Sequence, residues 1–132
     1  MNDKELYNIA KSALVKAYAP YSHFSVGAAL LGANGQVYTG VNVENSSFGA
    51  TICAERTAFT KAISEGCKEF SAIAVTSSEG EAFPCGICRQ FMFEYGDDLR
   101  IIVGNNENEL RSFTISELLP HGFRLNQYNI SK

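Results

Sequence analysis

Three cysteines at the starts of two helical segments constrain this chain more than any other feature. Cys53 begins a segment of helical periodicity that runs to Glu65, and Cys85 and Cys88 begin another that runs to Tyr95. The buried stripe expected for the first segment is Ala58, Phe59, Ala62 and Ile63. On the stretch TICAERTAF alone, a capped helix with a buried cysteine explains the residues as well as a chemical site does. The residues that lie beside Cys53 in the fold therefore decide between a buried structural cysteine and a chemical site.

The Cys85-x-x-Cys88 pair fits two kinds of site, a redox dithiol or half of a zinc site. A redox dithiol usually follows the first or second strand and needs no third thiolate. A structural zinc site normally has four protein ligands, whereas a catalytic zinc has three and keeps one position open. Cys67 and the two histidines have no partner at metal-ligand spacing. We therefore expect a catalytic zinc held by Cys53, Cys85 and Cys88, because soft thiolates favour this metal.

Charged residues flank the cysteines. Helix N-termini carry partial positive charge, which stabilises thiolates placed there. Glu55 lies two residues after Cys53, where its carboxylate can reach a water at the open metal position and act as a general base and then as a general acid. Arg56 and Arg89 each adjoin a cysteine. We expect both to offset the negative charge of three thiolates by hydrogen bonds to sulfur.

The remaining pattern predicts an α/β fold. Helical spacing from residue 6 stops before Pro20, and two strand-like runs separated by GANG read as a hairpin. The further elements expected are strands at 70–75, 99–103 and 110–114 and helices at 53–65, 85–95 and 115–119. The first strand, FSVGAALL, is apolar or small on both faces, which favours a central position. We expect one domain over residues 1–132, a three-layer α/β/α sandwich with a mixed sheet of about five strands.

Composition limits the partners of such a domain. The net charge is −3 and the eleven Lys and Arg residues are scattered, so the chain lacks the concentrated positive charge that nucleic acids and anionic membranes require. No stretch approaches the roughly 20 apolar residues of a membrane span. The N-terminus has no secretory pattern. We expect a cytoplasmic protein that binds a small or neutral ligand.

The order Cys53-Ala54-Glu55 followed by Pro84-Cys85-Gly86-Ile87-Cys88 matches the signature of zinc nucleobase deaminases. The wider chain resembles the small, homotetrameric class of cytidine deaminases with three cysteine ligands. The segments that carry the resemblance are AYAPYS, FSVGAAL, GVNVENSS, CAERTA, KAISEG, PCGICRQ and ELLP.

This resemblance implies zinc-dependent hydrolysis of cytidine and 2′-deoxycytidine to the uridine nucleosides, with release of ammonia, in pyrimidine salvage. It implies that Glu55 moves protons to N3 and to the departing amine. Phe24 would pack on the base, and Asn42 with Glu44 would bind the ribose hydroxyls. Independently of the family, the Ala54 N–H at a helix start is a plausible donor to the pyrimidine carbonyl.

The chain also departs from the family's usual residues. Phe48 stands where many relatives have tyrosine, Phe83 replaces a small residue, and Ile87 replaces alanine. In relatives an aromatic near residue 123 reaches a neighbouring subunit's site, so Phe123 and Phe48 are the candidates here. Two alternatives stay open: a deaminase of a cytosine nucleoside antibiotic of the blasticidin type, which Glu44 and the following asparagine disfavour, and a non-catalytic zinc-stabilised binding module.

Overall fold

The computed structural model describes residues 1–125. Its elements follow in the order α1 (Asp3–Ala13), η1 (Leu14–Lys16), β1 (Val26–Gly32), β2 (Val37–Val41), η2 (Phe48–Ala50), α2 (Ala54–Ser64), β3 (Phe70–Ser77), α3 (Gly86–Phe93), β4 (Arg100–Gly104), β5 (Leu110–Thr114) and α4 (Ile115–Leu118), where η marks a 3-10 turn. Among these residues no helix has both the length and the apolar character needed to cross a membrane.

The five strands form one mixed sheet in the order β2-β1-β3-β4-β5. β1 pairs antiparallel with both β2 and β3, and β4 pairs antiparallel with β5. Only β3 and β4 are parallel, as expected for two strands joined by a crossover through α3. The mixed five-stranded sheet predicted from the sequence is confirmed.

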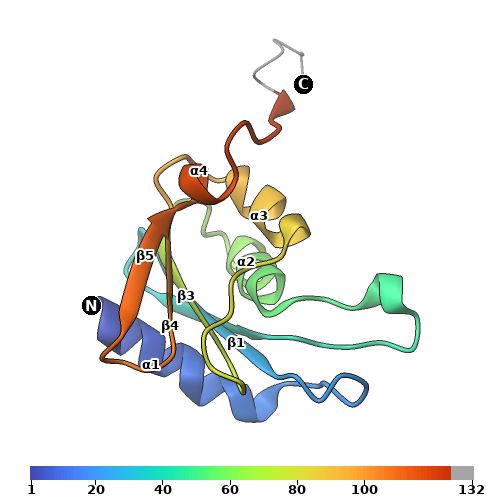
Figure 1. Ribbon diagram of the computed structural model, residues 1–132. Helices are drawn as coiled ribbons and strands as arrows, with labels where there is room; N and C mark the ends of the chain where they lie inside the picture. Colours follow the sequence, from blue (N-terminus) through green and yellow to red (C-terminus); the bar gives the residue numbers. More distant parts are fainter. Residues whose placement is uncertain (126–132) are drawn as a thin grey trace.

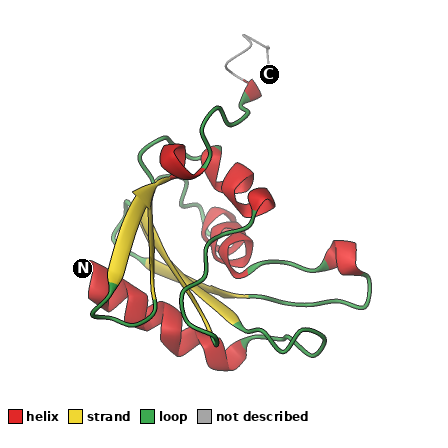
Figure 2. Ribbon diagram, in the orientation of Figure 1, coloured by secondary structure: helices red, strands yellow, loops and turns green. Residues whose placement is uncertain are grey.

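Helices cover both faces of this sheet (Figures 1 and 2). α1 lies on one face, and α2 and α3 lie on the other (Figure 1). The side chains of β1 alternate accordingly: Ala28 and Leu30 belong to the core cluster under α2, whereas Ala29 belongs to the cluster under α1. The three layers and the double coverage of β1 both agree with the sequence prediction.

Close backbone approach fixes α2 on β2. A Cβ atom at Gly40 would lie 2.3 Å from the Ala54 carbonyl oxygen and 2.5 Å from the Ala58 nitrogen. Only glycine leaves room for the helix at this position. The start of α2, where Cys53 and Glu55 lie, is therefore held directly against the second strand.

Aromatic packing joins α2 to α3. The fully buried ring of Phe59 lies 4.8 Å from Phe70 at the start of β3, 6.0 Å from Phe91 and 5.4 Å from Tyr95. Edge-to-face and offset ring pairs of this kind stabilise packing beyond their buried area. The cluster sets the two helices side by side, which brings their N-terminal ends to one place.

The first helix is shorter than predicted. α1 ends at Ala13, and after the 3-10 turn the chain becomes extended instead of remaining helical to residue 19. Tyr18 pairs there with the segment after β2, since its N–H donates to Asn42 O and its carbonyl accepts from Glu44 N. Tertiary pairing thus overrides the local helical pattern. Most of the other boundaries differ from the expectation by one to three residues.

Candidate active site

The two helix starts meet at a cluster of three thiols. Cys53 is the N-cap of α2, Cys85 is the N-cap of α3, and Cys88 lies in the first turn of α3. The Sγ atoms of Cys53 and Cys85 are 3.9 Å apart, and those of Cys85 and Cys88 are 3.6 Å apart. All three sulfur atoms lie within 4.8 Å of one another, the one such grouping of metal-ligating side chains in the described part of the chain.

This sulfur geometry fits zinc. A tetrahedral ion with Zn–S bonds of about 2.3 Å places its sulfur ligands about 3.8 Å apart. The three cysteines supply three ligands and leave the fourth position open, as in catalytic sites. All are free of disulfides. The structure therefore brings together the metal ligands that the sequence predicted.

Arg56 is the cation beside the cluster. Its Nη2 donates to the Cys53 sulfur at 3.7 Å and to the Thr51 carbonyl at 3.3 Å, while its buried Nε has no hydrogen-bond partner among the described residues. Hydrogen bonding from Cys88 first, and then from Arg56, lowers the pKa of Cys53 to about 5. Arg56 thus makes a hydrogen bond to one of the site's sulfur atoms, and its role in balancing their charge stays a prediction.

Arg89 contacts carbonyl groups, which was not predicted. Its Nε donates to the Pro84 carbonyl at 2.8 Å and its Nη1 to the Leu118 carbonyl at 2.9 Å. No hydrogen bond from Arg89 to a sulfur is found among residues 1–125. Arg89 therefore ties the residue before Cys85 to the end of α4.

Glu55 lies buried in the first turn of α2, with 4% of its surface exposed. Burial, and to a lesser degree the negative charge of Cys53, raises the pKa of this carboxyl group to about 7. A buried carboxyl beside a metal cluster that exchanges its proton near neutral pH has the properties of an acid–base catalyst. No salt bridge to Glu55 is found among residues 1–125, and a buried carboxyl group without one is costly unless it serves a function.

A cavity of about 270 Å³ opens onto Glu55, Cys53 and Cys85. Its lining residues are Ser22, Phe24, Val26, Asn42, Glu44, Thr51, Ile52, Cys53, Ala54, Glu55, Val75, Ala82, Phe83 and Cys85. Five residues predicted for the substrate or the proton transfer are among them. Ser22, Val26, Thr51, Ile52, Val75 and Ala82 were not predicted, because small and apolar side chains carry no chemical signal in a sequence.

Asn42 and Glu44 line the cavity and also organise its rim. The side-chain amide of Asn42 donates to the Phe24 carbonyl at 2.8 Å and accepts from the Val26 N–H at 2.9 Å. One oxygen of Glu44 accepts from the backbone N–H groups of Tyr21 and Ser22 at 2.9 and 3.1 Å, and the other accepts from the Ser22 hydroxyl. These bonds lower the pKa of Glu44, the Ser22 hydroxyl contributing most. Both residues therefore fix the loop that presents Phe24.

Three aromatic or apolar residues singled out in the sequence lie outside this cavity. Phe48 is 78% exposed and borders a neighbouring shallow pocket, and Phe123 is 51% exposed. Ile87 is also exposed and does not line the cavity, so its replacement of alanine leaves the cavity wall unchanged.

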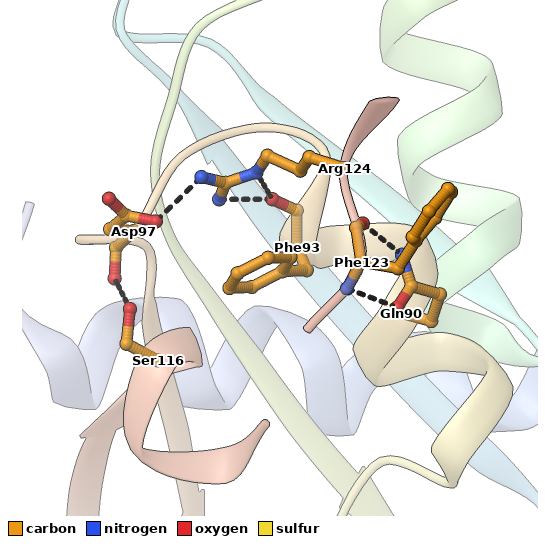
Figure 3. A network of polar contacts seen from close by, with 6 residues as sticks. All are labelled: Gln90, Phe93, Asp97, Ser116, Phe123 and Arg124. Carbon is orange, nitrogen blue, oxygen red and sulfur yellow. Dashed lines mark hydrogen bonds and ion pairs between the residues drawn. The ribbon is translucent and has the colours of Figure 1, made fainter. Parts of the chain in front are cut away.

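The segment that carries Phe123 is anchored to α3 (Figure 3). The side-chain amide of Gln90 donates to the Phe123 carbonyl at 2.8 Å and accepts from its N–H at 3.2 Å. Arg124 lies 3.9 Å from the Phe93 ring, donates to the Phe93 carbonyl at 2.7 Å and pairs with Asp97 at 2.7 Å. The backbone at residue 123 is thus held in place by its neighbours in the same chain.

Fold and site together define a class: an α/β/α domain with a three-thiolate metal site beside a buried glutamate is a zinc-dependent deaminase domain. Residues 1–105 match the family model described as cytidine and deoxycytidylate deaminase zinc-binding region. The chain belongs to this family, and the zinc-binding region of the family contains the three cysteines.

Individual relatives support this assignment. The chain is 50% identical to a probable cytidine deaminase of Dictyostelium discoideum over 91% of this chain and 84% of that protein. It is 45% identical to a cytidine deaminase of Halalkalibacterium halodurans over 98% and 99% of the two chains. A crystal structure of cytidine deaminase from Burkholderia pseudomallei matches with a TM-score of 0.87 and 45% identity, over 93% and 100% of the chains. A blasticidin-S deaminase of Bacillus cereus is more distant, at 32% identity over 89% of each chain.

Proposed function

We propose that this protein is a zinc-dependent cytidine deaminase that hydrolyses cytidine and 2′-deoxycytidine to uridine and 2′-deoxyuridine and releases ammonia. The observation that carries the proposal is the position of Glu55. It is buried beside the three-thiol cluster, in the first turn of the helix that Cys53 caps, and its carboxyl pKa is raised to about 7. A structural metal site has no need of such a group.

Zinc held by Cys53, Cys85 and Cys88 supplies, when bound, the Lewis acidity that makes water nucleophilic near neutral pH. Glu55 takes a proton from the attacking water and delivers it to N3 of the pyrimidine. As the C4–N4 bond breaks, Glu55 passes the second proton of that water to the departing amine, which leaves as ammonia. A carboxyl group poised near pH 7 serves both transfers, since it exchanges protons readily in either direction.

The other cavity residues hold the nucleoside in place. The ring of Phe24 packs on the base, and the N–H of Ala54 donates to the pyrimidine carbonyl, because the first N–H groups of a helix have no intrahelical acceptor. Asn42 and Glu44 accept from the ribose hydroxyls. The Asn42 side-chain oxygen accepts one hydrogen bond, from Val26, and one Glu44 oxygen accepts only from the Ser22 hydroxyl, so each has a second lone pair available.

The experiment is to mix zinc-quantified protein with cytidine and to follow the loss of the cytidine ultraviolet band together with the release of ammonia. Both signals should appear at equal rates for cytidine, and 2′-deoxycytidine should also react. The absence of both signals with zinc-loaded protein would refute the proposal. Blasticidin S belongs in the same assay, since its preferential turnover would favour the antibiotic-deaminase alternative.

The assembly we propose is a cytoplasmic homotetramer in which a neighbouring copy completes each cavity with Phe48 and Phe123. Two observations support it. Both rings are largely exposed and lie outside the cavity of their own chain, which is unfavourable for large apolar side chains in an isolated monomer. The hydrogen bonds from Gln90 fix the backbone that carries Phe123, so this residue is held at a defined position (Figure 3).

A further inference from the structure

The loop between β3 and α3 forms the wall of the cavity next to the metal cluster. Ala82 and Phe83 line the cavity, Pro84 is buried, and Cys85 caps α3 as a metal ligand. Any movement of this loop changes both the shape of the cavity and the approach to the reacting end of a bound nucleoside. What holds the loop in place therefore bears on which substrates fit.

A clamp centred on Arg111 of the edge strand β5 holds this wall. The Arg111 Nη2 atom pairs with Glu81 Oε1 at 2.5 Å. The guanidinium carbon lies 5.4 Å from the centre of the Phe83 ring and 5.6 Å from that of Phe113, and the two rings are 5.6 Å apart. A planar guanidinium is suited to pairing with a carboxylate while it lies over aromatic faces.

A second contact fixes the backbone of the same loop at Glu81. The Asn105 side-chain oxygen accepts from the Glu81 N–H at 3.0 Å, and it would lie 2.8 Å from a Cβ at Gly80. Residues 81 and 83 are thus tied to β5 and to the turn before it. The position of the cavity wall is set by the far edge of the sheet, so a change at that edge acts on the cavity at a distance.

We propose that Phe83 is a specificity determinant and that Arg111 is its positioning residue: the clamped wall limits the substituent that a pyrimidine can carry at C5, beside the reacting carbon. The inference rests on the proposed function. If C4 lies at the metal cluster and N3 meets Glu55, then C5 lies on the other side of C4 from N3. The wall formed by residues 82–85 faces that side and restricts the space beside C5.

The test compares kcat/KM for 5-methylcytidine and for cytidine in the holoenzyme and in the variants Phe83→Ser and Arg111→Met. Pockets discriminate one methyl group by about 10–200-fold, so the ratio of the two values should rise about tenfold when the wall is loosened. Arg111 is 56% exposed, so its replacement leaves the core intact. Arg111→Lys keeps the ion pair but not the planar contact, and it should give an intermediate ratio.

Arg100→Met is the matched control. Arg100 lies on the neighbouring strand β4, and it is another exposed arginine that pairs with a carboxylate, that of Asp3. This variant should keep the wild-type ratio. In the double variant Phe83→Ser/Arg111→Met, the second change should add nothing, since Arg111 acts through Phe83.

An unchanged ratio in both single variants, or an equal loss of kcat/KM for both substrates, would overturn the inference and leave the clamp a purely structural feature. A wild-type protein with no cytidine turnover would instead refute the proposed function. The two failures are thus distinguishable in one data set.

Discussion

At the scale of single residues, position within a helix gives Glu55 its chemistry. A glutamate in the first turn of an exposed helix has a pKa well below 7, because the helix dipole favours its charged form. Here Glu55 is buried at the cavity wall, and this burial, with a further contribution from the charge of Cys53, raises its pKa to about 7. The same side chain is thereby changed from a stabilising surface charge into a proton carrier.

The substitution Glu55→Gln should lower kcat by about 10²–10⁴-fold or more, since the amide cannot transfer protons. The amide is isosteric and neutral, so the fold and the bound zinc should be retained. Ammonia release and zinc content by mass spectrometry measure the two effects. Turnover close to that of the wild type would show that the proton path is wrong.

Cys85→Ala is the companion change. It removes a metal ligand, so zinc content should fall and the melting temperature should drop with it, because metal binding contributes to folding. The contrast between a variant that keeps zinc without activity and one that loses both separates chemistry from structure. Equal zinc content in the two variants would mean that Cys85 is not a ligand.

At the scale of elements, the site depends on how closely α2 lies on β2. The Cβ atom of an alanine at residue 40 would overlap the backbone of Ala54 and Ala58. Backbone atoms cannot rotate away as side chains can, so the helix itself would have to move. Because α2 carries Cys53 and Glu55 at its start, this displacement would reach the site.

Gly40→Ala should therefore lower the free energy of unfolding by about 1–3 kcal/mol, as for other overpacked positions, and should reduce activity as well. Urea unfolding and the cytidine assay measure these effects. Gly49→Ala is the control, because nothing lies within 4 Å of its Cβ. A Gly40→Ala protein as stable as the Gly49→Ala protein would contradict this account of the packing.

The attachment of α1 to β4 is sensitive to pH. The Asp3 carboxylate pairs with Arg100 through two hydrogen bonds, of 3.0 and 2.7 Å, and these lower the pKa of Asp3 below its usual value of 3.8. A lowered folded-state pKa contributes stability that is complete above the unfolded-state pKa and is lost as the pH falls through the folded-state value.

Asp3→Asn should thus be less stable than the wild type at neutral pH. The difference between their free energies of unfolding should shrink to zero as the medium is acidified below the ordinary aspartate range. Chemical denaturation at several pH values measures this difference, in which effects common to both proteins, such as zinc release, cancel. A difference that does not change with pH would exclude the ion pair as its source.

At the scale of the whole molecule, large apolar side chains in and near the cavity are exposed. Ile52 and Phe83 line the cavity, Phe48 borders the neighbouring pocket, and each is exposed by 41% or more in the single chain. An enzyme that binds a small nucleoside benefits from a closed site, since exclusion of water strengthens its electrostatic contacts. A neighbouring copy is the covering partner in the proposed tetramer.

Mixing the inactive Glu55→Gln protein with a Phe123→Ala protein tests whether sites are shared. After subunit exchange, sites that combine Glu55 of one variant with Phe123 of the other should regain activity above that of either protein alone. Native mass spectrometry of the mixture reports the hybrid tetramers. Hybrids without any gain in activity would show that Phe123 acts only within its own chain or not at all.

The linear pattern alone predicts the order of elements, the central place of β1, the metal ligands and a proton-transfer role for Glu55. These depend on local periodicity and on residue chemistry at fixed spacing, both of which are visible in one dimension. The identity of the cavity wall and the contacts of Arg89, Asn42 and Arg111 were decided only by the tertiary structure. They join residues far apart in the chain, as does the pairing of Tyr18 that ends α1 early. Such contacts depend on which backbones meet, and a linear pattern does not specify that.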